Sequence, residues 1–205
     1  MTSATAARKL AASDWTEAAI QTLLSSGIDA VQITRLAGDL GVSRGSFYWH
    51  FADRAELLES LLTQWHQLNS RAIKVALSDV DSLSEAILSF FALWMDDAGF
   101  SPSLDQAIRD WARLDTAVFA LVQQEDKLRI SHISRCFERF GFDKREAPVR
   151  ARVLYFAQIG YYAMHMQESM HERNALLEPY YTSFTGRKLS AKAARQFKQH
   201  VEASL

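Results

Sequence analysis

The residues best suited to chemistry stand in one run, which places an arginine, two serines, a tyrosine, a tryptophan and a histidine within eight positions. Their guanidinium, hydroxyl and ring N–H groups donate hydrogen bonds, which phosphate oxygens and the base edges of DNA accept. Phe47 and Phe51 lie four residues apart, so on a helix they share one face and anchor it on a core. Tyr48, Trp49 and His50 cannot all face inward beside them. The run therefore predicts an outward-facing surface for binding nucleic acid, and it reads Ser43-Arg44-Gly45-Ser46-Phe47-Tyr48-Trp49-His50-Phe51.

Two short helices joined by a tight turn would hold this run in place. Leu36 and Leu40 face inward on the first helix, and Ala37 is small where the two helices must cross closely. Gly41 supplies the left-handed turn residue. Ser43 is expected to cap the second helix through its hydroxyl, which leaves Arg44, Gly45 and Ser46 at the end that meets base edges. This arrangement is typical of a helix-turn-helix, in which one helix braces another in the major groove.

The charge pattern does not by itself indicate a nucleic-acid partner. The 205-residue chain has a net charge of −1, and residues 1–60 carry five Lys or Arg against seven Asp or Glu. Arg54, at the first turn of the next helix, is predicted to hold a phosphate together with that helix N-terminus. Any DNA contact must come from local placement of a few cations, namely Arg8, Lys9, Arg35, Arg44 and Arg54.

Helical spacing of apolar residues runs along the rest of the chain, so the predicted class is all-α. Capping boxes at Asp53 with Glu56 and at Ser82 with Glu85 open two helices. Phe140-Gly141-Phe142 is typical of a Schellman stop. A long helix from about Glu146 to Met170 has two apolar faces, one running Val149, Val153, Ala157, Gly160 and Met164, and the other Tyr155, Ile159, Tyr162, Met166 and Met170. We expect one face on the core and one on a partner, then a loop at 179–186 and a final basic helix at 189–201.

Aromatic residues on these helices are candidates for a ligand pocket, because Trp and Tyr bring polar groups that a core does not need. The candidates are Trp94, Trp111, Tyr155 and Tyr162, with Arg109 and Gln158 as further polar contacts. The six histidines and the single cysteine have no metal-ligand spacing, so no metal and no cofactor are expected. Phosphate loops and serine-nucleophile motifs are absent, so no catalytic residue is predicted.

The segment from Trp15 to Trp65 resembles the N-terminal domain of the TetR family of regulators. The resemblance covers about a quarter of the chain and is carried by Ile33-Thr34-Arg35-Leu36-Ala37, the run from Gly41 to Phe51, and Asp53-Arg54-Ala55-Glu56-Leu57-Leu58. It implies a DNA-binding domain at residues 1–52 and a helical ligand-binding and dimerisation domain at 53–205. It also implies a homodimer, usually a repressor, that binds a double-stranded DNA operator and responds to a small-molecule effector.

Carried over by position, the resemblance places Ser43, Arg44, Ser46, Tyr48, Trp49 and His50 on DNA, with Thr34 and Arg54 as flanking phosphate contacts. Two positions depart from the family pattern. Gln32 stands where a capping Ser or Thr is frequent, which puts the start of the bracing helix in question. Arg54 replaces a commoner Lys, and the phosphate contact should survive that change.

A second hypothesis is a helical small-molecule-binding or adaptor protein with a vestigial DNA-binding head, which the acidic balance of residues 1–60 favours. A cytoplasmic location is expected, because the N-terminus lacks an apolar signal segment and no apolar run is long enough to span a membrane. Cys136 is interpreted as a packing residue.

Overall fold

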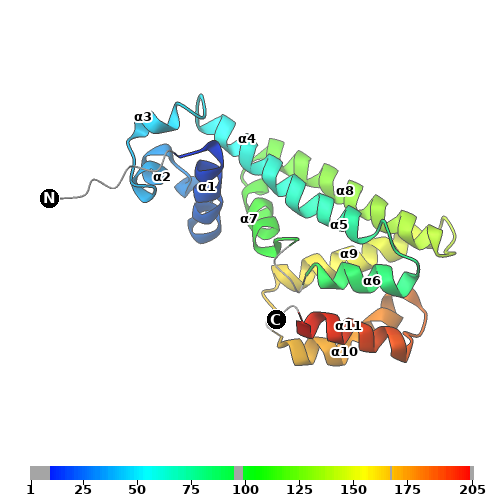
Figure 1. The fold of residues 1–205 in the computed structure, drawn as a ribbon. Helices are drawn as coiled ribbons and strands as arrows, with labels where there is room; N and C mark the ends of the chain where they lie inside the picture. The colour runs from blue at the N-terminus through cyan, green and yellow to red at the C-terminus, as the bar shows by residue number, and fades with distance from the viewer. Residues whose placement is uncertain (1–9, 95–98, 167, 204–205) are drawn as a thin grey trace. The chain divides into compact units, whose positions relative to one another are not determined.

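The computed structural model describes residues 10–94, 99–166 and 168–203, and these residues form helices and connecting turns with no strand. The predicted all-α class is therefore confirmed (Figure 1). No helix among the described residues is both long and apolar enough to cross a membrane. The helices are α1 (Ala12–Ser26), α2 (Ile33–Asp39), α3 (Arg44–Phe47), α4 (Arg54–Trp65), α5 (Arg71–Ala76), α6 (Leu83–Ala92), α7 (Pro102–Ala112), α8 (Thr116–Arg139), α9 (Ala147–Ala163), α10 (Met170–Thr185) and α11 (Ala191–Ala203), with a 3₁₀ turn at Ile28–Ala30 and a π-helical turn at His66–Ser70.

The chain forms two compact units that divide between Trp65 and His66. From the sequence we expected the division after residue 52, which would have placed α4 in the second unit. The structure instead packs α4 along α1. Leu57, Leu61 and Trp65 of α4 are fully buried, so the first unit needs α4 to complete its core.

The first unit is built around three buried aromatic side chains, of which the sequence predicted Phe47 and Phe51 to be buried. Trp15 of α1 meets Phe47 of α3 edge-to-face, with ring centroids 5.2 Å apart. Phe47 stacks on Phe51 at 5.5 Å, and both rings are buried. Between α2 and α3, Gly41 has φ +67°, the left-handed conformation expected of it. The amide of Val42 then donates to the Ala37 carbonyl at 2.9 Å, which closes the turn.

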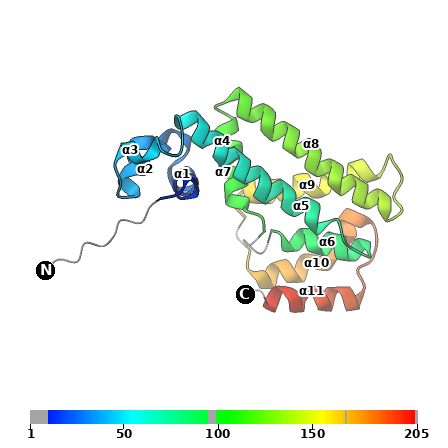
Figure 2. The same ribbon diagram turned by 45° about the horizontal axis from the view of Figure 1, so that its top comes forward.

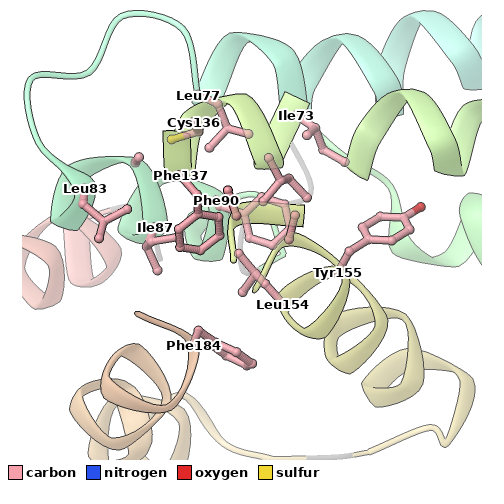
Figure 3. Close-up of a cluster of buried hydrophobic side chains, with 14 of the residues drawn as sticks. Ile73, Leu77, Leu83, Ile87, Phe90, Cys136, Phe137, Leu154, Tyr155 and Phe184 are labelled. Carbon is pink, nitrogen blue, oxygen red and sulfur yellow. The ribbon is translucent and has the colours of Figure 1, made fainter. Parts of the chain in front are cut away.

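The second unit is a helical bundle in which α8 lies along both α7 and α9, and α6 packs against α5, α8 and α11. Both ribbon views show α10 and α11 side by side (Figures 1 and 2). The main core takes side chains from five helices (Figure 3). Its members include Ile73 of α5 and Leu77 directly after it, Ile87 and Phe90 of α6, Cys136 and Phe137 of α8, Leu154 and Tyr155 of α9, and Phe184 of α10.

Three local signals at helix ends that the sequence predicted are confirmed, at Asp53, Ser82 and Gly141. The amide of Glu56 donates to Asp53, and that of Glu85 donates to Ser82. At the end of α8, the amide of Phe142 donates to the Phe137 carbonyl at 3.1 Å across Gly141, whose φ is +89°. These bonds are those of a Schellman stop, and the two phenylalanine rings pack edge-to-face beside it.

Two expectations about the C-terminal third are wrong. The helix that begins near Glu146 ends at Ala163 rather than Met170, and His165 turns the chain with φ +52°. The segment 179–186 is mostly helical rather than a loop, because Pro179 lies inside α10. A proline within a helix costs about 3 kcal/mol. Leu177, Tyr181 and Phe184 bury one face of α10, and this packing offsets the cost.

Two glycines of the first unit make a matched pair for testing the turn. Gly41→Ala should lower the free energy of unfolding by about 1–2 kcal/mol, because a Cβ is disfavoured at positive φ. Gly38→Ala should raise it by about 0.5–1 kcal/mol, because Gly38 is helical and a Cβ there meets no atom within 4 Å. Urea unfolding monitored by circular dichroism measures both. Equal effects of the two substitutions would contradict this account of the turn.

Candidate functional site

The predicted DNA-binding residues form an exposed surface on and around α3. Trp49 is 87% exposed and Tyr48 53% exposed, which is unusual for large aromatic side chains. Ser46 and His50 are half-buried. The remaining predicted residues of this surface are exposed, namely Thr34, Ser43, Arg44 and Gly45. The structure therefore brings the polar groups of the run to the outside.

The α3 surface is held by the aromatic core directly beneath it. Phe47 is fully buried, and it contacts Trp15 of α1 on one side and Tyr48 edge-to-face at 5.3 Å on the other. Phe47 and Phe51 fix the orientation of this segment on the core. No orientation that keeps both of them buried could also bury all the side chains between them. The exposed rings of Tyr48 and Trp49 are thus a consequence of the packing.

Two of the predicted contacts are placed differently from the expectation. Ser43 is the N-cap residue of α3, but its hydroxyl makes no capping hydrogen bond; the Ser46 amide donates to the Ser43 carbonyl instead. Arg54 is half-buried and donates from Nε to the Val31 carbonyl at 2.6 Å and from Nη2 to the Ile28 carbonyl at 2.9 Å. Its guanidinium therefore links α4 to the 3₁₀ turn. This geometry does not support the predicted phosphate contact.

The cations away from α3 contribute less to this surface. Arg35 donates to the Ser26 hydroxyl at 3.0 Å and lies 3.8 Å from Asp39. Arg8 and Lys9 lie outside the described residues. Arg44 is exposed, and its guanidinium makes no hydrogen bond or ion pair among the described residues.

A cavity of about 140 Å³ lies in the second unit between α6, α9 and α10. We call it the α6–α9–α10 cavity. Its lining is mostly aromatic and apolar, and polar groups enter from α9, α10 and the segment between them. The lining residues are Phe91, Trp94, Ala157, Gln158, Tyr161, Glu168, Arg173, Leu177, Tyr180 and Phe184. Ala157 and Tyr180 are exposed, so the cavity reaches the surface there.

The charged groups of the cavity bond to one of its tyrosines. Arg173 donates from Nε to the Tyr161 hydroxyl at 3.1 Å, and that hydroxyl donates to Glu168 at 3.0 Å. The guanidinium also lies 4.8 Å from the centroid of the Tyr161 ring. Partial burial, followed by the bond to Glu168, raises the pKa of Tyr161, so its hydroxyl remains a donor.

Of the four predicted ligand residues, only Trp94 lines the α6–α9–α10 cavity, together with the predicted polar residue Gln158. Tyr162 lies behind Trp94, with its ring stacked at 5.3 Å and its hydroxyl donating to the Trp94 carbonyl. Trp111 is buried in α7 and does not line this cavity. Tyr155 is also absent from the lining, because its hydroxyl belongs to a buried polar network.

The sequence analysis missed the α10 wall, which carries Arg173, Leu177, Tyr180 and Phe184. A signal for it was present. Ser169 and Glu172 form a capping box, with the Ser169 amide donating to Glu172 at 2.7 Å and the Glu172 amide donating to Ser169 at 3.3 Å. That spacing predicts a helix beginning at residue 170.

The buried network centres on Arg129 of α8, whose side chain is fully buried. Its Nη1 donates to Asp105 of α7 at 2.7 Å and to the Tyr155 hydroxyl of α9 at 3.2 Å. Its Nε donates to the Ser70 hydroxyl of the π-helical turn at 2.9 Å. Burial alone would lower the pKa of Arg129, but Asp105 and Tyr155 outweigh it and raise that pKa, so the guanidinium stays charged.

A second arginine closes the network. Arg109 donates from Nε to Asp105 at 2.9 Å and from both Nη atoms to Asp126, and also to the Tyr155 hydroxyl at 3.0 Å. Tyr155 in turn donates to Asp126 at 2.6 Å. Burial raises the pKa of Tyr155, which keeps its proton in this bond. With two bonds accepted and one donated, the hydroxyl has no capacity left for a ligand.

The network also fixes the π-helical turn at the start of the second unit. Ser70 donates to Glu125 at 2.6 Å, and His66 lies 2.9 Å from the same carboxylate. The Asn69 amide bonds to both the N–H and the carbonyl of Ser101, the N-cap residue of α7. π-helical turns are rare and frequently mark functional positions.

Comparison with known proteins identifies the first unit. Residues 16–61 match the family model of bacterial regulatory proteins of the tetR family. Over 63 residues the chain is 32% identical to the HTH-type transcriptional regulator TtgR of Pseudomonas putida. That segment is 31% of this chain and 30% of TtgR, so the chain matches less than a third of the length of this relative. The sequence resemblance to the TetR family is confirmed on these residues.

Solved structures share this fold over most of the length of the chain. The ketosteroid transcriptional regulator KstR2 of Mycobacterium tuberculosis aligns with a TM-score of 0.59 at 14% identity, over 94% of this chain and 92% of its own. The superantigen PfiT aligns with a TM-score of 0.60 at 14% identity, over 98% and 97% of the two chains. At such identities these likenesses establish the fold and leave the function to be argued from residues.

The buried network predicts a large difference between two aspartates of α7. Asp105→Ala should lower the free energy of unfolding by about 3–5 kcal/mol, because it leaves the Arg129 guanidinium buried without its carboxylate. Asp110→Ala is the control; its side chain is 57% exposed and lies 3.6 Å from Arg113, so the change should stay within about 0.5 kcal/mol. Chemical denaturation of both variants measures the difference, and a cost below about 1 kcal/mol for Asp105→Ala would contradict it.

Proposed function

We propose that this chain, whose residues 16–61 form a TetR-family helix-turn-helix domain, is a cytoplasmic transcriptional repressor that binds a pseudo-palindromic DNA operator as a homodimer. In this proposal a small-molecule effector enters the α6–α9–α10 cavity and weakens operator binding. The single observation that carries the proposal is the α3 surface. Its polar and aromatic side chains face outward from a helix that Phe47 and Phe51 fix on the core.

The DNA contacts follow from the chemistry of that surface. Arg44 is a guanidinium that can bond to guanine or to phosphate, and it sits at the first position of α3. The uncommitted hydroxyl of Ser43 can donate to a phosphate oxygen. Tyr48 and His50 supply further donors, and Thr34 of α2 flanks them. Because the first unit is not basic overall, affinity depends on these local contacts rather than on a general positive field.

Homodimerisation is supported by an uncovered apolar stripe on α9. Val149, Val153 and Phe156 are each more than half exposed, and they recur at helical spacing along one face. Gly160 continues the stripe, and a Cβ built there meets no atom of this chain within 4 Å. A second copy of α9 would cover these side chains. The two α3 helices of the dimer would then lie in consecutive major grooves, with the two half-sites about 34–36 Å apart.

The effector response follows from the position of the cavity. Ala157, Gln158 and Tyr161 of α9 line it, while Val153 and Phe156 belong to the exposed stripe of the same helix. A ligand between α9 and α10 would therefore contact the helix that is proposed to join the two subunits. If the ligand favours a dimer geometry that fits the operator poorly, the two binding equilibria are linked, and each weakens the other by the same factor.

Loss of two α3 side chains should abolish specific DNA binding. For Arg44→Ala combined with Tyr48→Ala, we expect at least about a hundredfold loss of affinity for operator fragments selected from genomic DNA. The slope of log affinity against log salt should fall by about 2, because the variant loses one cationic phosphate contact per subunit. Arg113→Ala removes the same charge from a side chain that is 74% exposed on the second unit, and it should bind like wild type. Equal gel retardation by wild type and the double variant would refute the proposed interface.

The dimer contact can be tested with two phenylalanines of similar exposure. Phe156→Glu places a charge in the α9 stripe and should give a monomer at micromolar concentration, because burying an unpaired carboxylate is costly. Phe119→Glu is the control, since Phe119 is 52% exposed on α8 and Phe156 is 55% exposed on α9. Sedimentation velocity distinguishes the two. A monomeric wild type, or a dimeric Phe156→Glu variant, would rule out the α9 stripe as the subunit contact.

A further inference from the structure

A second cavity of the second unit lies between α8 and α5 with the turn that follows α5, and we call it the α5–α8 cavity. Leu77 and Cys136, both labelled in Figure 3, belong to its lining and also to the buried core, so they form its floor. Its volume is about 180 Å³, which exceeds the roughly 150 Å³ of an engineered cavity that binds benzene. It shares no lining residue with the α6–α9–α10 cavity.

The lining of the α5–α8 cavity carries positive charge from two helices. Lys74 belongs to α5, and Arg135 and Arg139 belong to α8. No Asp or Glu is found among the described residues of the lining, although Asp79 and Glu138 are next to lining residues in the chain. Within the described part of the chain, no carboxylate forms an ion pair with any of the three cations. Their charge therefore has no counter-charge from the protein.

Arg139 is held in place by backbone carbonyl groups. Its Nη1 donates to the Ser78 carbonyl at 2.8 Å, and its Nη2 donates to the carbonyls of Leu77 at 3.3 Å and Val80 at 3.1 Å. Carbonyl oxygens carry no net charge, so the guanidinium keeps its positive charge. These bonds fix that charge at the end of α5 before any ligand arrives.

His132 and Cys136 show the effect of their surroundings on the cavity. Burial, followed by the charges of Arg135 and Lys74, lowers the pKa of His132, so its ring is neutral at pH 7. Nη2 of Arg135 lies 2.8 Å from Nδ1 of His132, and because arginine only donates, Nδ1 is the acceptor. Burial raises the pKa of the Cys136 thiol, so no thiolate cancels the positive charge.

We infer that the α5–α8 cavity binds a phosphate group, either as inorganic phosphate or as part of a small phosphate monoester. Phosphate carries a charge of about −1.5 to −2 at pH 7 and several strong acceptor oxygens, which match cations better than a singly charged carboxylate does. Arginine and lysine are the usual phosphate-binding side chains. Lys74 and Arg135 come from opposite sides of the cavity, so one anion between α5 and α8 can contact both. Neither operator binding nor the α6–α9–α10 cavity requires this site, so the inference goes beyond the proposed function.

Titration calorimetry at pH 7.5 and constant ionic strength tests the ligand class with wild-type protein. Inorganic phosphate and glycerol 3-phosphate should each bind at one site per chain, and acetate should bind at least about tenfold more weakly. Equal binding of acetate and phosphate, or no binding of either phosphate probe, would overturn the inference. Tighter binding of inorganic phosphate would identify free phosphate as the ligand, whereas tighter binding of glycerol 3-phosphate would identify a monoester.

Three substitutions of exposed cations locate the binding site. Lys74→Gln and Arg135→Gln each remove one charge from the lining, so each should lower phosphate affinity about tenfold. Lys127→Gln is the matched control, because Lys127 is exposed on α8 and does not line the cavity. It should bind phosphate like wild type, and circular dichroism verifies that each variant is folded. An equal loss in Lys74→Gln and Lys127→Gln would mean that general charge attracts the anion, which contradicts the inferred site.

The protonation of His132 gives a second readout that leaves the site unchanged. A bound phosphate brings negative charge beside Arg135 and Lys74, so it should raise the pKa of His132 toward its ordinary value. Proton NMR of the His132 ring measures this, with the resonance assigned by its loss in His132→Gln. A pKa that does not move at saturating phosphate would place the bound anion elsewhere and overturn the inference.

Gel retardation separates this inference from the proposed function, because DNA also carries phosphates. Lys74→Gln and Lys127→Gln should retard operator fragments equally. A loss of retardation in Lys74→Gln alone would assign the cations to DNA and overturn the inferred small-molecule site. If wild type binds phosphate as expected and does not retard DNA, the phosphate site stands and the repressor proposal fails.

Discussion

The second unit depends on the burial of one positive charge, that of Arg129. A guanidinium without access to water is stable only if carboxylates and hydrogen-bond acceptors surround it. Its partners come from three other elements, because Asp105 belongs to α7, Tyr155 to α9 and Ser70 to the π-helical turn. A shift of any one of these elements would break a buried ionic or polar contact. The arrangement therefore favours a bundle that moves between discrete states rather than one that deforms gradually.

Helix α9 has three separate roles, one on each of three faces. Inward, Tyr155 places its ring in the apolar core and directs its hydroxyl away from the neighbouring side chains of that core, toward the network (Figure 3). Ala157, Gln158 and Tyr161 line the cavity. Outward, Val153 and Phe156 remain uncovered. The sequence already shows two apolar faces on this helix, and the structure adds the cavity between them.

The reliability of the sequence predictions follows the distance over which the signals act. The turn at Gly41, the caps at Asp53 and Ser82 and the stop at Gly141 depend on neighbours within six residues, and these four are confirmed. The predicted cap at Ser43 is a local exception, because its hydroxyl makes no capping hydrogen bond. The roles of Tyr155 and Arg54 depend on partners more than 20 residues away, and spacing did not reveal them. Pro179 was misleading because its usual effect is local, whereas the packing of α10 that overrides it comes from tertiary contacts.

The position of the α6–α9–α10 cavity bears on how an effector would act. Its charged lining groups bond to Tyr161, and the charges of the Arg129 network are paired by Asp105 and Asp126. A ligand that leaves both sets of pairs intact would exert its effect through its volume and its contacts. A ligand in the cavity would contact α9, which carries both the network residue Tyr155 and the exposed stripe. Since Tyr155 holds one side of α9 through its hydrogen bonds, a change in α9 would fall on the exposed face that carries Phe156 and Val153. In the proposed mechanism, a ligand would therefore alter the exposed stripe of α9 rather than the buried network.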